Sequence, residues 1–425
     1  MNGFRAAIVI LTGLYSLSAL AMIPAWSNSI AHSPKIRVRL GDASSLAKIH
    51  GLDLKIYSSD LKIHQPVAAP DMKSGWEFNC TSSGRVRARL VAGKSKQSLF
   101  NLASPVWVQS PAGFMHVNDR PYREIVRLYA VKGHCEVVNE VDLEKYLDGL
   151  VNSEFSAKWN EEAIAAQVVA ARTYALFQIK RAKKSAHYDV DATVKDQVYD
   201  GSMKEDFRSS RSVEKTRGEV LTVTKTAKPE ILKAFYHSTC GGFTEVPEKV
   251  WGKAFPGFKR PVACHYCATS PRYHWDFEFT GSEMALLLIE GAKKENGLKG
   301  WSSDWREALL RGQLVQLQVN HPPTQGLPRA TDVDSVWKLS DRLVQLKIPA
   351  SRFREWLGPG KLRSTAFQIV SAQSPQGTRW HFEGRGNGHG VGMCQWGAKV
   401  MGEKGFRTAD ILKYYYPDAS LRKLW

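Results

Sequence analysis

Hydrophobic and polar positions alternate along the first part of the chain. Between residues 36 and 40, three aliphatic side chains are separated by two arginines, and a period of two is typical of a strand with one buried face. Residues 52–56 and 86–91 repeat this pattern, and residues 118–141 continue it. Because glycine and proline separate these segments, we expect a β-rich region over residues 35–117.

The period becomes helical beyond these strands. Asp142 is a candidate N-cap for an amphipathic turn over residues 143–150. Asn160 is a candidate N-cap for a longer helix that ends near Ala182 and has two glutamates in its first turn, where negative charge is favourable. The many alanines of the longer helix allow another element to approach closely. Its predicted packed stripe consists of Ala163, Ile164, Val168, Ala171, Ala175 and Ile179.

Shorter elements follow this helical pair. We expect a helix over residues 209–217, a strand over 218–224 and a helix over 282–292. The predicted fold class is α+β, with mixed strands around a central helical pair. A chain of 425 residues exceeds one ordinary core, so two or three units are expected.

Glu154 occupies the break between the two predicted helices, and Arg172 lies on the second of them. A carboxyl group at a helix junction beside a guanidinium is a candidate acid/base site. The alternative is that Glu154 caps a helix or forms an ordinary ion pair. Because a tight ion pair lowers a carboxyl pKa and opposes an acid role, we expect Arg172 to face a substrate or to act at longer range.

Four residues have the spacing of metal ligands. His237 and Cys240 form H-x-x-C, and Cys264 and Cys267 form C-x-x-C. Two short chelating pairs separated by a loop suit tetrahedral zinc in a structural site with no open position. His265 is an alternative to His237. The other interpretations are a disulfide from Cys240 to one of the later cysteines, or a redox-active C-x-x-C pair.

The first 21 residues predict an export signal. Arg5 provides the positive charge, residues 6–20 are mostly apolar, and residues 19–21 form a small-x-small cleavage site. An uncleaved membrane anchor is the alternative, and it would be the one membrane contact. Export favours disulfides, so Cys80 and Cys135 are a candidate pair.

The composition is basic. The chain has 59 lysines and arginines against 41 acidic residues, a formal net charge of +18. Such a balance suits a polyanionic partner, although it is equally a generic charge for solubility. An exported chain rarely meets nucleic acid, so we expect no nucleic-acid partner. The bacterial wall, which presents carboxylates and phosphates, fits better.

Several separate stretches resemble one known family, that of stage II sporulation protein D and the amidase enhancer LytB. They are YLDGLVNSEF at 146–155, W-x-x-EAIAAQVVAARTYAL at 159–176, DQVY-x-G at 196–201, FYHSTCGGFTE at 235–245 with VWG at 250–252, and GRGNGHGVGMCQWGA at 384–398. The resemblance covers roughly residues 118–425 and implies that these residues form the catalytic core. Residues of about 280–345 diverge and are expected to form a surface insertion.

The resemblance implies a function and a location. Members of this family are lytic transglycosylases that cut peptidoglycan glycan strands, or enhancers of cell-wall amidases. The first activity implies Glu154 as the single general acid and base, a 1,6-anhydro product and no cofactor for the chemistry. The partners would be glycan strands and a cell-wall amidase, in the periplasm or the cell-wall space.

The resemblance also implies further site residues. Tyr199, in the DQVY motif, would help to line the cleft. The glycine-rich segment lacks a P-loop lysine and dinucleotide spacing, and it would wall the cleft with His389 and Gln395 as polar contacts; the alternative is a structural turn. A zinc near the HST-GG segment fits some members. Cys394 stands where the family usually has serine, as a buried small side chain or a further ligand.

Overall fold

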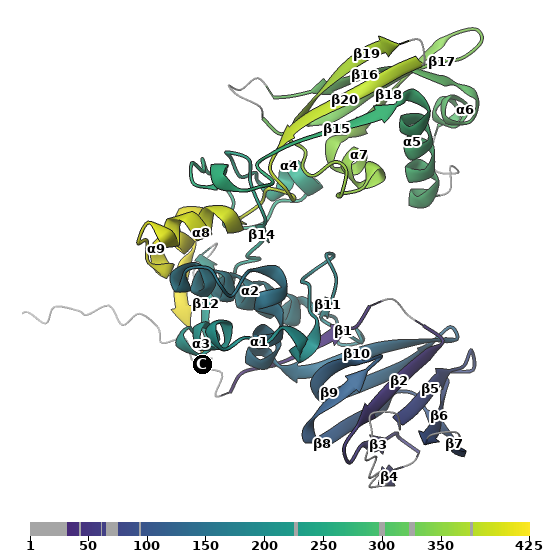
Figure 1. Ribbon diagram of the computed structural model, residues 1–425, viewed down its shortest axis with the longest axis vertical. Helices are drawn as coiled ribbons and strands as arrows, with labels where there is room; N and C mark the ends of the chain where they lie inside the picture. The colour runs from purple at the N-terminus through teal and green to yellow at the C-terminus, as the bar shows by residue number, and fades with distance from the viewer. Residues whose placement is uncertain are drawn as a thin grey trace, which may run out of the picture.

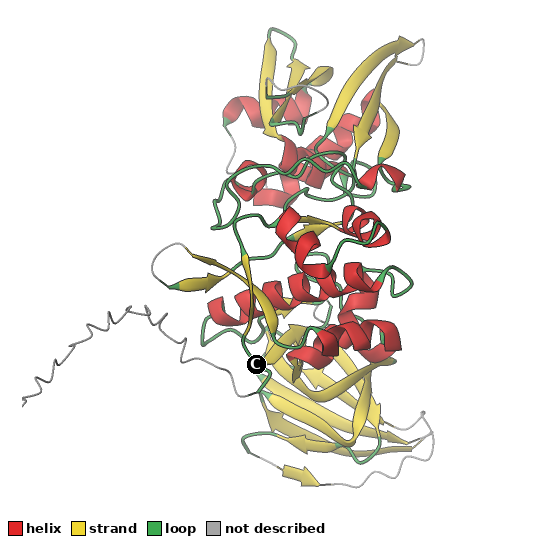
Figure 2. Cartoon of the chain, turned by 90° about the vertical axis from the view of Figure 1, so that its left-hand side faces the viewer, coloured by secondary structure: helices red, strands yellow, loops and turns green. Residues whose placement is uncertain are grey.

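The computed structural model describes residues 32–41, 44–60, 62–64, 75–92, 95–224, 228–296, 302–322, 328–374 and 377–425. The expected export signal lies outside these ranges. Within them, no helix combines the length and the apolar composition needed to cross a membrane. Figures 1 and 2 show three layers stacked along the long axis: a lower sheet, a helical layer and an upper unit. The chain is a mixed α+β protein, as the sequence predicted.

The lower sheet is antiparallel except where β11 joins it. Its strands follow the order β11-β1-β10-β9-β8-β2-β5-β6-β7, with β3 and β4 attached beside β8. The bounds are β1 Lys35–Arg39, β2 Leu46–Gly51, β3 Lys55–Tyr57, β4 Lys62–His64, β5 Gly75–Cys80, β6 Arg85–Ala92, β7 Ser95–Ala103, β8 Val106–Val117, β9 Arg120–Val131, β10 His134–Asp142 and β11 Val190–Asp191. Because β8 and β9 form a hairpin, the sheet continues across the boundary expected near residue 118.

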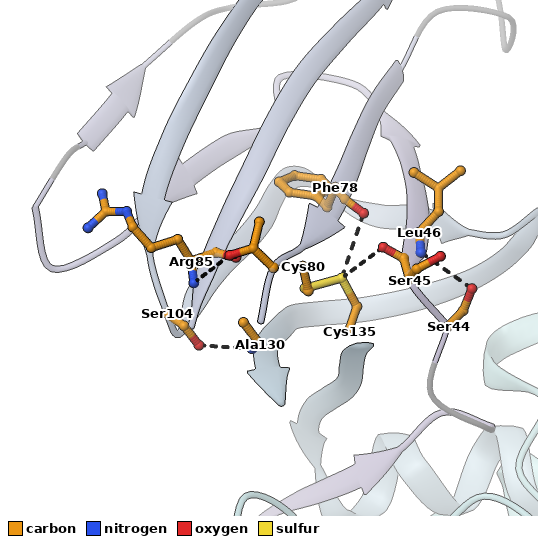
Figure 3. The surroundings of a disulfide bond; sticks show 10 residues. Ser44, Ser45, Leu46, Phe78, Cys80, Arg85, Ser104, Ala130 and Cys135 are labelled. Atoms are coloured by element: carbon orange, nitrogen blue, oxygen red, sulfur yellow. Dashed lines mark hydrogen bonds between the residues drawn. A yellow bond between two sulfur atoms is a disulfide. The ribbon is translucent and has the colours of Figure 1, made fainter. Parts of the chain in front are cut away.

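The lower sheet curls so that distant strands face each other. Strands β5 and β6 pack across β9 and β10 although three strands separate β5 from β10 along the sheet. Cys80 at the end of β5 and Cys135 in β10 are joined by a disulfide with their Cα atoms 5.1 Å apart, as Figure 3 shows. The predicted pairing of these two cysteines is therefore confirmed.

The helical layer rests on the lower sheet and contains the predicted helical pair. Asp142 caps α1 through its side chain, and Asn160 caps α2 in the same way. The bounds are α1 Leu143–Glu154, α2 Glu161–Arg181, α3 Phe207–Lys215, β12 Glu219–Thr224, β13 Pro229–Ile231, β14 Tyr236–His237, α4 Pro247–Trp251, β21 Met393–Cys394, α8 Gln395–Glu403, α9 Thr408–Tyr415 and β22 Ser420–Lys423, with short 3-10 helices at Gly201–Lys204 and Cys267–Thr269.

Helix α2 is the centre of this layer. Residues 163–176 are buried on every side of the helix, because α1, α3, α8, α9 and β12 all pack against it. The predicted stripe of small and aliphatic residues is therefore only part of its contact surface. A helix that is covered all round presents no free face for a ligand along this stretch.

The upper unit encloses a hydrophobic core of its own. The core runs from Trp275 to Phe382 and includes the fully buried Trp337 and Trp380. Helices α5, α6 and α7 pack against two three-stranded sheets, β15-β20-β19 and β16-β17-β18. The bounds are β15 His274–Thr280, α5 Gly281–Asn296, α6 Ser303–Arg311, β16 Gln313–Asn320, β17 Asp332–Lys338, β18 Leu343–Pro349, α7 Ala350–Leu357, β19 Phe367–Ser374 and β20 Gly377–Arg385.

Candidate active site and cysteine cluster

Glu154 is the last residue of α1. Its carboxyl Oε1 accepts a hydrogen bond of 2.6 Å from the backbone N–H of Val198. Its own backbone carbonyl accepts a bond of 3.2 Å from Nε2 of Gln395, at the start of α8. The end of α1, the DQVY loop and the end of the glycine-rich segment therefore meet at this carboxylate, although they are far apart in sequence.

The environment of Glu154 favours the protonated carboxyl. Burial raises its pKa to about 7, and the Val198 N–H, which stabilises the carboxylate, opposes only part of this shift. The negative end of the α1 dipole acts in the same direction as burial. Among the described residues no basic side chain forms an ion pair with Glu154. A carboxyl group in these surroundings is divided between its two protonation states near neutral pH.

Two tyrosines near this carboxyl are bridged by Gln197. The Tyr146 hydroxyl donates to Oε1 of the fully buried Gln197 over 3.2 Å, and Nε2 of Gln197 donates to the Tyr236 hydroxyl over 3.0 Å. Burial, and then the charge of Glu154, raises the pKa of both tyrosines well above the usual value. Both tyrosines therefore remain neutral near Glu154.

Arg172 does not face a substrate, contrary to the expectation. Its side chain is 0% exposed, and its Nη2 lies 2.8 Å from a carboxylate oxygen of Glu144. The same guanidinium donates to the Thr216 hydroxyl and to the backbone carbonyls of Val213 and Glu219. Arg172 therefore joins α2 to α1 and to the α3–β12 connection, on a face of α2 that is closed to solvent.

Tyr199 is likewise part of the interior. It is 3% exposed, its hydroxyl donates to Oδ1 of Asn139 over 2.9 Å, and its ring packs between Tyr122 and Tyr146. Gly201 has φ +65°, and a Cβ there would lie 2.1 Å from a backbone oxygen. This half of the DQVY-x-G motif therefore fixes the loop, and the half that contains Val198 reaches Glu154.

His389 lies in the glycine-rich loop and is partly buried. Its Nδ1 accepts a hydrogen bond of 3.0 Å from the Val391 N–H, which assigns the ring proton to Nε2. Burial, followed by the nearby His237 and Arg329, lowers its pKa well below the usual value. His389 is therefore a neutral imidazole, a hydrogen-bond donor and not a cation.

The four cysteines outside the disulfide gather in one buried cluster. The sulfur atoms of Cys240, Cys264, Cys267 and Cys394 all lie within 4.8 Å of one another, and none of the four is disulfide-bonded. The sulfurs come together because β14 and β21 pair in parallel, with His237 opposite Cys394. This group can hold a metal ion.

His237 was expected to be a ligand in this group, and the structure corrects that expectation. Its Nδ1 faces the carbonyl of Val391 at 3.1 Å, on the side of the glycine-rich loop, and the metal-ligand group does not include it. The contact with the Val391 carbonyl holds the imidazole at the glycine-rich loop, whereas the Cys394 sulfur lies among the other three sulfurs. Cys394 takes the fourth position.

The surroundings of the cluster suit thiolates. The backbone N–H groups of Cys240 and Gly397 point at the Cys394 sulfur over 3.3 and 3.4 Å. The Tyr415 hydroxyl lies 3.2 Å from the Cys264 sulfur. Donors of this kind stabilise sulfur ligands from outside the coordination sphere. A tetrahedral ion with bonds of about 2.3 Å fits four sulfurs at these separations.

Arg329 is a residue of the upper unit that the sequence analysis did not identify. It is largely buried, and its guanidinium donates to the backbone carbonyls of Cys240 and Gly388 over 3.0 and 3.4 Å. At position 390 a Cβ would lie 2.3 Å from its Cζ, so a glycine is required there. Arg329 thus holds together the glycine-rich loop and residues 237–240, which we call the HST-C loop. Nothing in the sequence distinguishes it from the other arginines of this divergent region.

Known proteins match the chain over the helical layer and beyond. Residues 131–223 match the family described as stage II sporulation protein. An uncharacterized protein of Brachyspira hyodysenteriae is 31% identical over 280 residues, which are 66% of this chain and 66% of that protein. An amidase enhancer of Bacillus subtilis is 26% identical over 65% of this chain, and the chain spans only 40% of that protein's length.

A further relative shares most of its length with this chain. Stage II sporulation protein D of Bacillus amyloliquefaciens is 30% identical over 307 residues, which are 68% of this chain and 76% of that protein. The identity extends well beyond the residues that match the family description, and it agrees with the resemblance of five separate motifs. The chain belongs to the family of stage II sporulation protein D.

Proposed function

We propose that this protein is a peptidoglycan lytic transglycosylase that cleaves the bond between N-acetylmuramic acid and N-acetylglucosamine. The observation that carries the proposal is the Glu154 carboxyl, which has a pKa of about 7 and no cationic partner among the described residues. A general acid works best when its pKa is near the working pH. Membership of a family whose relatives include a sporulation protein and an amidase enhancer supports a role at the cell wall.

The mechanism needs one carboxyl group. Protonated Glu154 donates its proton to the glycosidic oxygen, the bond to C1 of the muramic acid breaks, and an oxocarbenium-like centre forms. Ionised Glu154 then takes the proton of the 6-hydroxyl, whose oxygen bonds to C1. The products are a 1,6-anhydro end and a free hydroxyl, and no water is consumed. Glycoside hydrolases instead use two carboxyl groups, whereas burial and the Val198 N–H account for the Glu154 pKa without a second carboxylate.

Neighbouring groups assist this carboxyl. The Val198 N–H stabilises the carboxylate after proton donation. Gln395 holds the backbone of Glu154 and so fixes its direction. His389, a neutral imidazole bonded to the backbone of both Val391 and Tyr236, holds the glycine-rich loop beside the site. Tyr199 and Arg172 act through the packing of the loop and the helices.

Substitution of Glu154 by glutamine tests the proposal. A general acid contributes about 10²–10⁴-fold to the rate, so Glu154→Gln should remove nearly all cleavage and leave the fold intact. The assay is mass spectrometry of digested glycan strands, with anhydro-muramic ends as the signature. Glu161→Gln is the matched control, because Glu161 lies at the exposed start of α2 and pairs with Arg211. Normal cleavage by a folded Glu154→Gln protein would reject the assignment.

A second candidate function is enhancement of a cell-wall amidase without catalysis. The relative named amidase enhancer favours it. In that case the Glu154→Gln protein would stimulate an amidase on purified sacculi as well as the unchanged protein does, and neither would release anhydro products. The two candidates thus differ in both readouts.

We also propose that the cysteine cluster holds a structural zinc ion in an exported protein. Four thiolates leave no open position for a water molecule, so the ion would stabilise the loops and supply no step of the reaction. Its ligands would be Cys240, Cys264, Cys267 and Cys394. The cluster ties the HST-C loop to the start of α8, and therefore to Gln395 and Glu154.

A further inference from the structure

An exposed tryptophan stands beside the candidate site. Trp251, the last residue of α4, is 44% exposed. Its ring centroid lies 4.8 Å from that of Phe235 and 5.1 Å from that of His389. Side chains of this size are normally well covered, so a tryptophan that is packed on one side and open on the other presents a ready contact surface.

The position of Trp251 is fixed by its surroundings. Helix α4 begins with Pro247 and ends at Gly252, which has φ +67° and donates its N–H to the Glu248 carbonyl. Phe235, which supports the indole, is itself packed against Tyr174 and Phe255. The open indole is therefore held by a closed helix end and by an aromatic base.

A lysine lies within the same aromatic group. The Nζ atom of Lys233 is 4.9 Å from the centroid of Phe235, 5.2 Å from that of Phe255 and 5.4 Å from that of Tyr174. Such distances are those of cation–π contacts. No carboxylate of the described residues forms an ion pair with Lys233, so its N–H donors are available to an acceptor on a ligand.

A series of contacts connects these residues to the surroundings of Glu154. His389 contacts Trp251 and the backbone of Tyr236. The charge of Glu154 in turn contributes to the raised pKa of the Tyr236 hydroxyl. From the other side, Tyr174 donates to Asp196 over 2.7 Å. Asp196 precedes by two positions the residue whose N–H binds Glu154. Figure 1 places α4 and β14 at the junction of the helical layer and the upper unit.

We propose that Trp251 is the stacking platform of a sugar subsite for the glycan strand, with Lys233 as a hydrogen-bond donor at its edge. A pyranose ring has an apolar face of C–H groups and a rim of hydroxyl and acetamide groups, and an indole face beside polar donors matches both. The proposal rests on the glycan substrate of the proposed function. It assigns to this residue binding of the strand, and no part in the chemistry.

The test measures binding separately from cleavage. All variants are made in the Glu154→Gln protein, and their affinity for purified peptide-free glycan strands is determined by isothermal titration calorimetry. We expect Trp251→Ala to weaken binding about tenfold, the loss of one aromatic stack, and Trp251→Phe to retain most of the affinity. Phe207→Ala is the matched control, because Phe207 is a 73% exposed aromatic residue on α3.

The outcomes separate this subsite from the proposed function. If Trp251→Ala binds strands as tightly as its parent, the subsite is wrong, whatever the activity of Glu154 variants. If Trp251→Ala melts normally and loses affinity while Glu154→Gln still cleaves, the subsite stands and the catalytic assignment falls. If Trp251→Phe binds as weakly as Trp251→Ala, or Phe207→Ala is equally weak, stacking at this position is rejected. Loss of amidase stimulation with unchanged strand binding would assign Trp251 to a protein partner and would overturn the proposal.

Discussion

The protonation of a single residue, Glu154, links the structure of the site to its proposed chemistry. The carboxyl lies at the end of α1, where burial raises its pKa to about 7. The resemblance to the family singled out this residue, whereas its place between two predicted helices is equally that of a helix cap or an ordinary ion pair. The sequence did not predict that Arg172 is enclosed, because burial depends on which elements cover α2, and these come from residues 207–224 and from the end of the chain.

The raised pKa of Glu154 predicts that two quantities, the cleavage rate and the relative stability, both decrease as the pH rises. In the proposed mechanism cleavage requires the protonated form, so kcat/KM should fall as the pH rises through about 7. The folded protein also binds this proton more tightly than the unfolded chain does between pH 4.5 and about 7. Its stability relative to Glu154→Gln should therefore decline by up to about 3 kcal/mol over that window. Urea unfolding of both proteins at pH 5 and pH 8 measures this difference, and an equal difference at both values would contradict it.

Arg172 is expected to contribute to stability rather than to catalysis. Arg172→Met leaves Glu144 buried without its cation, and breaking a buried ion pair in this way costs about 3–5 kcal/mol. The free energy of unfolding from denaturant titration gives the cost. Replacing both partners, as Arg172→Met with Glu144→Leu, should recover part of it, because no charge then remains buried. Loss of cleavage with unchanged stability would instead restore a role for Arg172 in the site.

At the scale of elements, local signals were easy to interpret and long-range pairings were not. Capping residues and helical periodicity located α1 and α2 to within a few residues. The fourth cysteine ligand could not be chosen, because the choice depends on the parallel pairing of β14 with β21, whose residues are more than 150 positions apart. The same pairing brings the glycine-rich loop against the HST-C loop, which no local pattern indicates.

The cysteine cluster predicts a metal content that depends on Cys394 and not on His237. We expect about one zinc ion per chain in the purified protein, by elemental mass spectrometry, and the absorption of cobalt bound to four thiolates after exchange. Cys394→Ser should weaken metal retention and lower the melting temperature. His237→Gln should retain the ion, since its imidazole faces Val391. Loss of metal in His237→Gln with retention in Cys394→Ser would reverse this ligand assignment.

The whole molecule is a stack of three layers whose contacts were only partly visible in the sequence. The predicted β-rich start and the helical pair are both present. Residues of about 280–345 were expected to form a surface insertion. The larger upper unit that includes them has a core of its own. The sequence did not indicate this core, because its apolar residues are spread over many short elements and show no strong local period. Arg329 then joins this unit to the site below it.

The disulfide predicts the stability of the lower sheet. Cys80 and Cys135 are 55 positions apart, and removal of a cross-link across such a loop typically costs about 2–4 kcal/mol. The double substitution Cys80→Ser with Cys135→Ser should therefore lower the midpoint of denaturant unfolding under oxidising conditions. Under reducing conditions the two proteins should converge. A difference that persists in excess reductant would assign the effect to packing of the serines.

The strand pair β15 and β20 has one more consequence. His274 and Arg385 are opposite each other in this pair. The chain therefore enters the upper unit and leaves it at neighbouring positions. We therefore expect that the length of the upper unit can change without moving Glu154. A shorter upper unit would nevertheless have to replace the hydrogen bonds of Arg329 to both loops. This requirement limits which changes in the upper unit the site can tolerate.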